Sequence, residues 1–329
     1  MNSFKPAWER GFCKQSVVVG ITALGMLGGV YAQLGAVERA DAGLSRRAAG
    51  EPLIAEQFSP VEESTAGVGS YAPRSTGDLD IGIQRLLKKS ESATPFWFAA
   101  DVNTFVTSNA FYTPQNEESD VFASLRIAVG ARPKLGGNWY LDAIVSQEFL
   151  RYNDFSDLDY EVFDGGIGVV RLIPELWDMV AALGYSFERV TLGDISDDFF
   201  MRHSAQVTLQ KQFVLTQFQR VVLAGTGSYD LDVDIDALTR NEYGFQTVYE
   251  YHFAGDWHAR GFYNLLYRDY TEIDRDDLTH IFGAGISWRP KKWLQAEVLA
   301  TYTINDSNID ALDYESGVVG LGASLRATF

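Results

Sequence analysis

The chain is poor in cysteine, in histidine and in positively charged residues. Of its 329 residues one is Cys and four are His, and 27 Lys and Arg stand against 44 Asp and Glu, giving a formal net charge of −17. This balance excludes duplex nucleic acid as a partner, because phosphate binding needs a basic surface. The 30 Gly and 9 Pro are too few for a collagen-like or a wholly disordered chain.

Long apolar runs are absent except near the N-terminus, at residues 16–31 (SVVVGITALGMLGGVY). Basic residues precede this run, and the small residues Val30 and Ala32 occupy the −3 and −1 positions of a cleavage site. The pattern predicts a signal peptide over residues 1–32. A membrane anchor is the alternative, but the run is shorter than the roughly 20 residues that a spanning helix needs.

Cys13 precedes the apolar run, whereas a lipoprotein cysteine would follow it. We therefore expect no lipid anchor. After cleavage the chain has no cysteine, which excludes disulfides, thiol catalysis and cysteine metal sites.

Residues 33–94 are rich in Ala, Gly, Ser, Glu and Pro, and we expect a mostly disordered periplasmic leader. Its one helical pattern lies at residues 79–89. That pattern is consistent with a short helix at the mouth or inside the lumen of a barrel, or with a flexible linker.

From residue 95 the apolar residues recur at every second position, which is typical of strands with one apolar and one polar face. Twelve such segments of roughly 11–16 residues are each long enough to cross a bilayer at a tilt. They lie at about 95–107, 120–131, 138–152, 160–172, 177–190, 201–211, 217–230, 240–253, 257–270, 278–289, 293–304 and 314–329. We predict an all-β fold, a transmembrane antiparallel up-and-down barrel over residues 95–329.

The connections alternate between longer polar loops and short turns, as in bacterial outer-membrane barrels. The six loops, at about 108–119, 153–159, 191–200, 230–239, 271–277 and 305–313, hold nineteen acidic residues and one basic residue, Arg275. We expect these loops to form an acidic, cation-gathering extracellular mouth.

Aromatic residues on the apolar face fall at both ends of the segments, as in the two interfacial girdles of membrane barrels. Trp139, Phe253, Trp257, Trp288 and Phe329 adjoin turns, and Phe149, Phe187, Tyr229, Tyr243, Tyr267 and Tyr302 lie toward loops. A soluble lipocalin-like barrel is the alternative, but it would turn its apolar face inward.

The polar face predicts a lumen in which basic and acidic side chains nearly balance and pair across strands. We expect it to be lined by Arg126, Asp142, Glu148, Arg220, Arg240, Glu242, Glu250, Arg260, Arg268, Glu297 and Arg326, and also by Asp101, Asp164 and Glu188.

Known catalytic and phosphate-binding motifs are missing, and we expect no enzyme activity. Outer-membrane proteases of the omptin type use acidic and Asp/His pairs at the rim. Asp197, Asp198, Asp276, Asp277, His203 and His280 are the residues of that kind here. However, twelve strands do not match the ten of the omptins, and His280 falls on the lipid-facing register. We therefore favour the alternative that these side chains are polar residues at the membrane interface.

Two local patterns suggest ligands. His252 and His258 flank a tight turn and could form a pH-responsive or metal-binding cluster in the lumen, or simply a solvated polar wall.

The second pattern is a run of four alternating aspartates, Asp230, Asp232, Asp234 and Asp236. An extended strand would place all four on one face, where they could bind Ca²⁺ or Mg²⁺. A solvated acidic strand end is the alternative, and no cofactor is required.

The C-terminus, Leu321 to Phe329, alternates and ends in Phe. It resembles the signal by which the barrel-assembly machinery recognises outer-membrane barrels, with Phe329 as the terminal element. Residues 267–329 resemble β-barrel porins linked to exopolysaccharide export. The resembling features are an Arg and Asp hairpin (Arg268, Asp269, Asp274 to Asp277), Trp293-Leu294, Asn305 to Asn308 and Asp313-Tyr314.

These observations together predict an outer-membrane, porin-like passage for small solutes or polysaccharide. Its expected partners are outer-membrane lipid, lipopolysaccharide, the assembly machinery and polysaccharide-export components. The alternative is a closed structural or surface-interaction barrel that binds cations, lipopolysaccharide or a cell-surface partner.

Overall fold

The computed structural model describes residues 95–176, 178–192 and 198–329. The expected signal peptide and leader lie outside these residues. Among the described residues no helix is long and apolar enough to span a bilayer.

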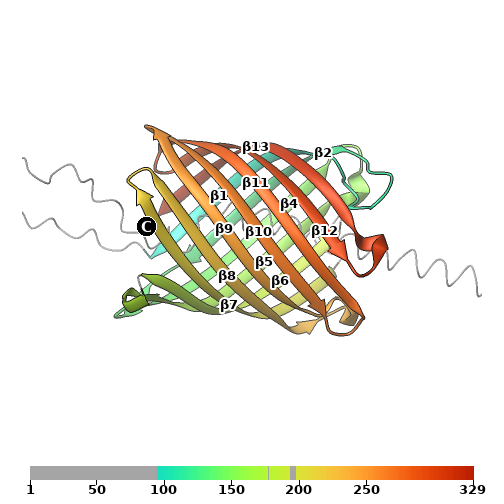
Figure 1. The fold of residues 1–329 in the computed structure, drawn as a ribbon, viewed down its shortest axis with the longest axis horizontal. Helices are drawn as coiled ribbons and strands as arrows, with labels where there is room; N and C mark the ends of the chain where they lie inside the picture. The colour runs from blue at the N-terminus through green and yellow to red at the C-terminus, as the bar shows by residue number, and fades with distance from the viewer. Residues whose placement is uncertain (1–94, 177, 193–197) are drawn as a thin grey trace, which may run out of the picture.

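Thirteen antiparallel strands form one sheet, and twelve of them close into a barrel (Figure 1). The strands are β1 (Phe96–Thr107), β2 (Asp120–Ala131), β3 (Lys134–Gly136), β4 (Trp139–Tyr152), β5 (Tyr160–Ile173), β6 (Met179–Leu192), β7 (Asp198–Thr216), β8 (Gln219–Val233), β9 (Arg240–Ala254), β10 (Trp257–Tyr270), β11 (Arg275–Lys291), β12 (Leu294–Ser307) and β13 (Tyr314–Thr328).

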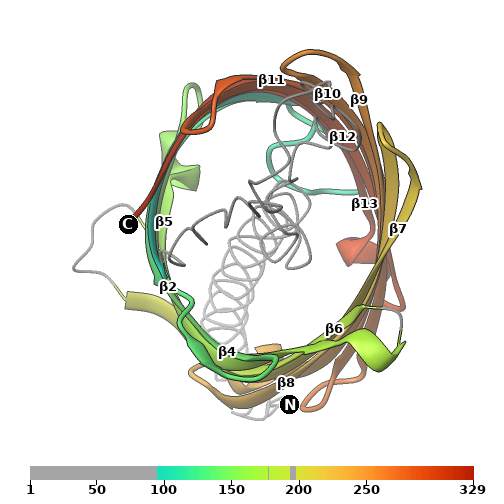
Figure 2. The same ribbon diagram turned by 90° about the vertical axis from the view of Figure 1, so that its left-hand side faces the viewer.

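The ring closes because β1 pairs with both β2 and β13, and β2 pairs with β4 across the short β3 (Figure 2). β3 pairs with β4 at a turn and is additional to the barrel. The predicted twelve-stranded all-β barrel is therefore confirmed. We call the end with the longer connections the loop end, and the end with the β2–β4, β5–β6, β7–β8, β9–β10 and β11–β12 connections the turn end.

Side-chain alternation sets which face is inside. On β2, Val121, Leu125 and Val129 are exposed while Phe122 and Arg126 are buried. The same period holds on other strands, where large apolar residues such as Leu183 and Leu321 remain more than 60% exposed. An apolar exterior is the arrangement of a membrane barrel, so the lipocalin-like alternative is wrong.

Aromatic side chains mark both ends of the exterior. At the turn end Trp257 stacks with Trp288 at 6.2 Å between ring centroids. Toward the loop end Tyr243 lies 6.0 Å from Tyr229 and 6.5 Å from Tyr267. The two predicted girdles thus lie at opposite ends of the strands.

Three long connections share one local structure, a 3₁₀ turn. η1 (Ser156–Leu158), η3 (Asp236–Leu238) and η4 (Asp310–Leu312) each follow an aromatic or Ile residue and end on Leu. In each the backbone N–H of that Leu donates to the carbonyl three residues earlier, at 2.8 Å. These hairpins occur at every fourth strand, so they are spaced evenly around the loop end.

The C-terminus completes the barrel seam. Phe96 and Phe329 exchange backbone hydrogen bonds of 3.2 and 2.9 Å, and their rings stack at 6.1 Å. Phe329 is 65% exposed on the exterior. It therefore contributes little burial to the finished barrel.

Deleting Phe329 should consequently impair assembly more than stability. We expect folded barrel in the membrane to fall several-fold in cells while unfolded precursor accumulates, and the purified refolded protein to unfold at nearly the same urea concentration. Heat-modified gel mobility of cell envelopes measures the first quantity. Normal insertion in cells would remove the argument for a C-terminal recognition signal.

Candidate functional site

The interior of the barrel carries the charged residues that the alternation assigned to a lumen. Strand pairing places the eleven residues first listed for the expected lumen on the inner face, opposite the exposed apolar positions of the same strands. Asp101, Asp164 and Glu188 share that face. Asp101 is the register partner of Arg126, which in turn faces Glu148.

Ion pairs cross the inner wall at the turn end. Arg220 pairs with Glu250, and Arg260 lies 2.6 Å from Glu297. Gln295 links Glu297 to Arg289 through hydrogen bonds of 3.0 and 2.8 Å. On the far side of the barrel Arg132 lies 2.7 Å from Asp142 of β4. On β13, next to the strand of Glu297, Arg326 lies over the Trp97 ring.

The two histidines of the β9–β10 hairpin do meet. His252 and His258 are register partners on the inner face, and their ring centroids lie 4.1 Å apart in an edge-on arrangement. Glu250 is two residues from His252, and Arg260 is two residues from His258, on the same face. Within the described residues, however, no three His, Cys, Asp or Glu side chains converge as a metal-binding group.

A second charged network lines the interior near the loop end. Arg240 and Arg268 both contact Glu242, at 3.4 and 2.8 Å. Arg268 also donates to Thr279, which donates to Asn305 at 2.6 Å. Because these residues come from four neighbouring strands, the network braces one side of the barrel.

Arg275 lies inside and forms an ion pair with Asp277, although both were expected in an exposed loop. Both side chains are fully buried, and the Arg275 guanidinium lies 4.2 Å from the Tyr270 ring centroid. The cause is that β11 begins at Arg275, three residues earlier than predicted, and alternation then turns both residues inward. The loop prediction was wrong for this pair.

The four aspartates of residues 230–236 do not share a face, which corrects the expectation from their alternation. A bulge in the β7–β8 pairing sets Ser204 against Asp230 and His203 against Asp232. Asp230 points inward, accepts a hydrogen bond from Ser204 at 2.9 Å and lies 3.6 Å from Arg202. Asp232, Asp234 and Asp236 are exposed, so the proposed four-carboxylate face does not exist.

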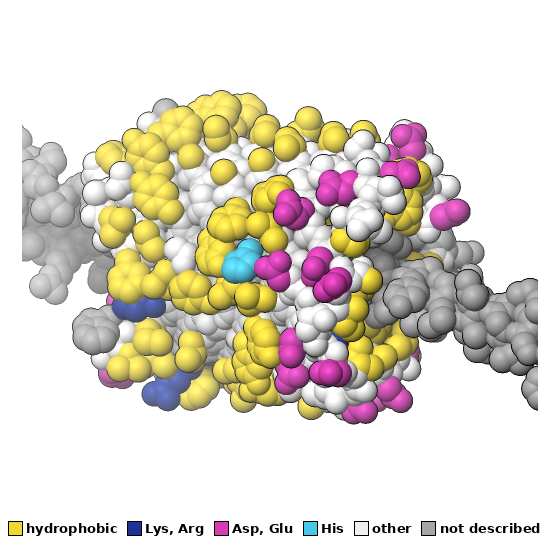
Figure 3. Space-filling model, turned by 45° about the vertical axis from the view of Figure 1, so that its right-hand side comes forward, with side chains coloured by type: hydrophobic (Ala, Val, Ile, Leu, Met, Phe, Trp, Pro, Cys, Tyr) yellow, Lys and Arg dark blue, Asp and Glu magenta, His cyan; other side chains and the backbone are white. Residues whose placement is uncertain are grey.

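Acidic side chains of the connections do gather at the loop end (Figure 3). The exposed ones are Glu117, Glu118, Asp154, Asp157, Asp232, Asp234, Asp236, Glu272, Asp274, Asp306 and Asp310. Asp159 and Asp313 instead accept backbone N–H groups of Tyr152 and Ser307, at 2.7 Å each, and so stabilise their turns.

An apolar cluster lines the interior just beneath the loops, and alternation over a polar lumen did not predict it. It consists of Ala110, Phe122, Leu150, Tyr152, Leu158, Tyr160, Val162, Val190, Phe200, Val233, Leu238, Tyr270 and Val318, all at most 8% exposed. Phe111 of the β1–β2 connection packs edge-on against Phe155 of the β4–β5 connection at 4.8 Å, and Figure 2 shows the former connection turned into the ring. The sequence feature that could have predicted this cluster is the presence of apolar residues, in place of polar ones, at the inner positions nearest the loop end of the strands.

The residues that could have suggested a protease do not come together. His203 and His280 lie on the outer face, where they hydrogen-bond Tyr185 and Tyr263. Asp276 accepts a hydrogen bond from the Tyr267 hydroxyl, also on the outer face, whereas Asp277 lies on the inner face. Asp197, and the side chain of Asp198, lie outside the described residues.

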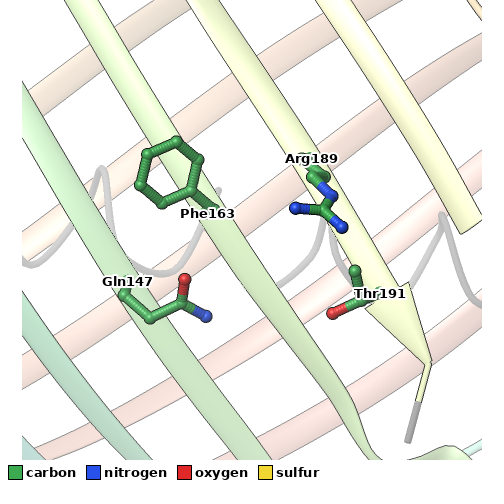
Figure 4. A pocket seen from close by; sticks show the side chains of 4 residues that line it. All are labelled: Gln147, Phe163, Arg189 and Thr191. Carbon is green, nitrogen blue, oxygen red and sulfur yellow. The ribbon is translucent and has the colours of Figure 1, made fainter. Parts of the chain in front are cut away.

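A small cavity, distinct from the barrel interior, opens on the outer face between β4, β5 and β6. It has a volume of about 170 Å³ and is lined by Gln147, Phe163, Arg189 and Thr191 (Figure 4). The first three are successive register partners, so they form one row across the strands. The cavity is separate from the barrel interior.

The chain matches no protein-family model and no curated protein sequence. Its structure is similar to that of an outer-membrane channel from Pseudomonas putida F1, with a TM-score of 0.52 and 10% identity over 72% of this chain and 97% of that one. The NanC and KdgM porins give TM-scores of 0.41 and 0.37, at 10% and 13% identity, over 69% of this chain and 98% of each. At 10% identity the likeness to the channel is one of fold: this chain has the fold of an outer-membrane β-barrel channel.

Proposed function

We propose that the protein is a porin-like passage for small solutes or polysaccharide in the bacterial outer membrane. The observation that carries the proposal is the inverted polarity of the barrel. Large apolar side chains such as Leu183 and Leu321 face outward, whereas the interior holds charged side chains such as Arg220, Glu250 and Arg260. Charged groups are costly to bury away from water, so an interior of this composition favours a hydrated path.

The exposed carboxylates at the loop end would concentrate cations before they enter. Like-signed charges around an opening raise the local concentration of counter-ions. Divalent cations such as Ca²⁺ or Mg²⁺ would associate with these loops without being required for folding.

Location and partners follow from the same proposal. The protein would be exported by its N-terminal signal and inserted by the barrel-assembly machinery through Phe329. It would contact outer-membrane lipid and lipopolysaccharide. An association with polysaccharide-export components rests on the resemblance of residues 267–329.

A closed structural or surface-interaction barrel is the second candidate, and the apolar cluster beneath the loops favours it. Side chains such as Phe122, Tyr160 and Phe200 are at most 2% exposed, and apolar constrictions can exclude water from a pore. For both the passage and the closed barrel we propose that the protein has no catalytic activity. A screen of the purified barrel for protease and lipase activity would test this proposal.

Single-channel recording in planar bilayers separates the two candidates. A passage should give stable, voltage-independent conductance steps, with cations preferred over anions at low salt. A protein that inserts, as shown by heat-modified mobility of the recovered vesicles, but remains silent at every salt concentration and voltage would support the closed barrel.

Replacing Asp232, Asp234 and Asp236 together by Asn should reduce cation preference at low salt and leave conductance at high salt nearly unchanged. These side chains are exposed, and the Debye length falls from about 30 Å at 0.01 M to about 3 Å at 1 M salt. Reversal potentials across a KCl gradient measure the preference. The matched control is Arg171→Gln on the outer face at the turn end; an equal shift in both variants would argue against the loop charges.

A further inference from the structure

The inner wall at the turn end holds two of the four histidines of the chain. His252 of β9 and His258 of β10 are register partners, next to a bulge in the pairing. Their ring centroids lie 4.1 Å apart, and the angle between the ring planes is 84°. The other two histidines, His203 and His280, hydrogen-bond tyrosines on the outer face. Two imidazoles from neighbouring strands therefore lie side by side inside the barrel.

One nitrogen of this histidine pair is buried without a hydrogen bond. Within the described part of the chain, Nδ1 of His258 is shielded from solvent and has no hydrogen-bond partner. Native structures leave few buried polar atoms unsatisfied, and each exception calls for an explanation such as a bound ion or a functional role. This nitrogen, beside a second imidazole, has the position of a ligand-binding atom.

The spacing of the two rings fits a single metal ion. Zn²⁺ binds histidine nitrogen at about 2.0–2.1 Å, so two nitrogens on one tetrahedral ion lie roughly 3.3 Å apart. Rings with centroids 4.1 Å apart can each present a nitrogen at that separation by rotating about the Cβ–Cγ bond. An imidazole that binds a metal through one nitrogen commonly donates a hydrogen bond through the other. Metal binding by the pair is therefore compatible with further contacts of either ring.

The charges around the pair favour a transition metal over Ca²⁺ or Mg²⁺. Three guanidinium groups and two carboxylates flank the histidines: Arg220, Arg260 and Arg289, with Glu250 and Glu297. Both carboxylates are engaged in ion pairs, with Arg220 and Arg260. Ca²⁺ and Mg²⁺ need several oxygen ligands, which this surrounding does not offer among the described residues. Zn²⁺ and Cu²⁺ instead accept neutral imidazole nitrogen.

We propose that His252 and His258 bind a divalent transition-metal ion, Zn²⁺ or Cu²⁺, at the turn end of the barrel interior. The two imidazoles fill two coordination positions, and water or donor atoms of a solute fill the others. The site is open in this sense because, among the described residues, no three His, Cys, Asp or Glu side chains converge. The inference does not depend on whether the interior conducts solutes.

The test is metal titration of the barrel, purified without a histidine tag from the outer membranes of cells that express the whole chain. Zn²⁺ is titrated by calorimetry in excess Ca²⁺, which occupies the exposed loop carboxylates. We expect the barrel to bind a single Zn²⁺ ion under these conditions. With Cu²⁺ as the probe, the electron paramagnetic resonance spectrum should show splitting from two nitrogen ligands.

Two double variants assign the site. His252→Gln with His258→Gln removes the pair, and His203→Gln with His280→Gln removes the two outer-face histidines, so both variants lose the same number of imidazoles. We expect the inner variant to lose the Zn²⁺ ion and the nitrogen splitting, and the outer variant to bind like the wild type. His258→Gln alone should weaken binding at least about tenfold, because losing a group that only orients a metal ligand already costs about 10–100-fold.

Every outcome decides the inference. Absence of Zn²⁺ binding by the wild type, equal affinity of the wild type and the inner variant, or a Cu²⁺ spectrum without two nitrogen ligands overturns it. Loss of binding in the outer variant alone also overturns it. A barrel that binds Zn²⁺ as expected but is silent in planar bilayers supports the metal site and counts against the passage. If the inner variant does not fold, as judged by heat-modified mobility, His252→Gln and His258→Gln are compared singly with the wild type.

Discussion

Replacing Arg275 by Ala should destabilise the barrel by about 3–5 kcal/mol, because it leaves the Asp277 carboxylate buried without its cation. Both side chains are fully buried, and Arg275 Nε donates to Asp277 at 3.0 Å. The change also removes the guanidinium from the Tyr270 ring. Urea unfolding in lipid vesicles, followed by tryptophan fluorescence, measures the loss.

The matched control replaces both partners. Arg275→Met with Asp277→Leu removes both charges and fills the site with apolar side chains, so its stability should lie close to that of the wild type. If the double variant were as unstable as Arg275→Ala, side-chain volume and not the stranded charge would explain the loss.

The second large effect concerns Gly168 of β5, whose backbone lies close to that of β6. A Cβ at this position would lie 2.6 Å from the Leu183 carbonyl oxygen and 2.9 Å from the Gly184 Cα. Backbone atoms cannot rotate away, so Gly168→Ala must move the strands apart, at a cost of about 1–3 kcal/mol. The urea midpoint and the temperature at which gel mobility changes should both fall.

Gly225 provides the control for Gly168. It also lies within a strand, but a Cβ there has no neighbour within 4 Å. Gly225→Ala should therefore be neutral or more stable by up to about 0.5 kcal/mol, since alanine restricts the unfolded chain. Equal destabilisation of the two variants would show that glycine itself, and not close strand contact, is needed at both positions.

The sequence predicts the strands well because a membrane barrel has an apolar and a polar face on every strand. The expected boundaries 120–131 and 257–270 are those of β2 and β10. The largest difference is β7, predicted at 201–211 and found at Asp198–Thr216. Its extension pairs with β8 up to Thr216 and Gln219, so backbone hydrogen bonds continue where the alternation of side chains weakens.

The interior was harder to predict than the strands. Alternation identified the inner face, but a bulge shifts it by one residue, and this alone separates Asp230 from Asp232. Nor does alternation reveal which inner residues pack together: Phe122 and Tyr152 are register partners on the neighbouring strands β2 and β4, and their rings stack at 5.2 Å. Such contacts depend on the register of the paired strands, which the alternation of side chains does not specify.

The central claim, that the chain spans the outer membrane with its acidic connections outside, is tested most directly by cysteine labelling of intact cells. Single cysteines at Glu117 and Asp310, both exposed at the loop end, and at Lys292 in a turn-end connection would be treated with a membrane-impermeant maleimide. We expect labelling of the Glu117→Cys and Asp310→Cys proteins on intact cells, and of the Lys292→Cys protein only after the outer membrane is ruptured. Labelling in the reverse order, or equal labelling of all three on intact cells, would contradict the account.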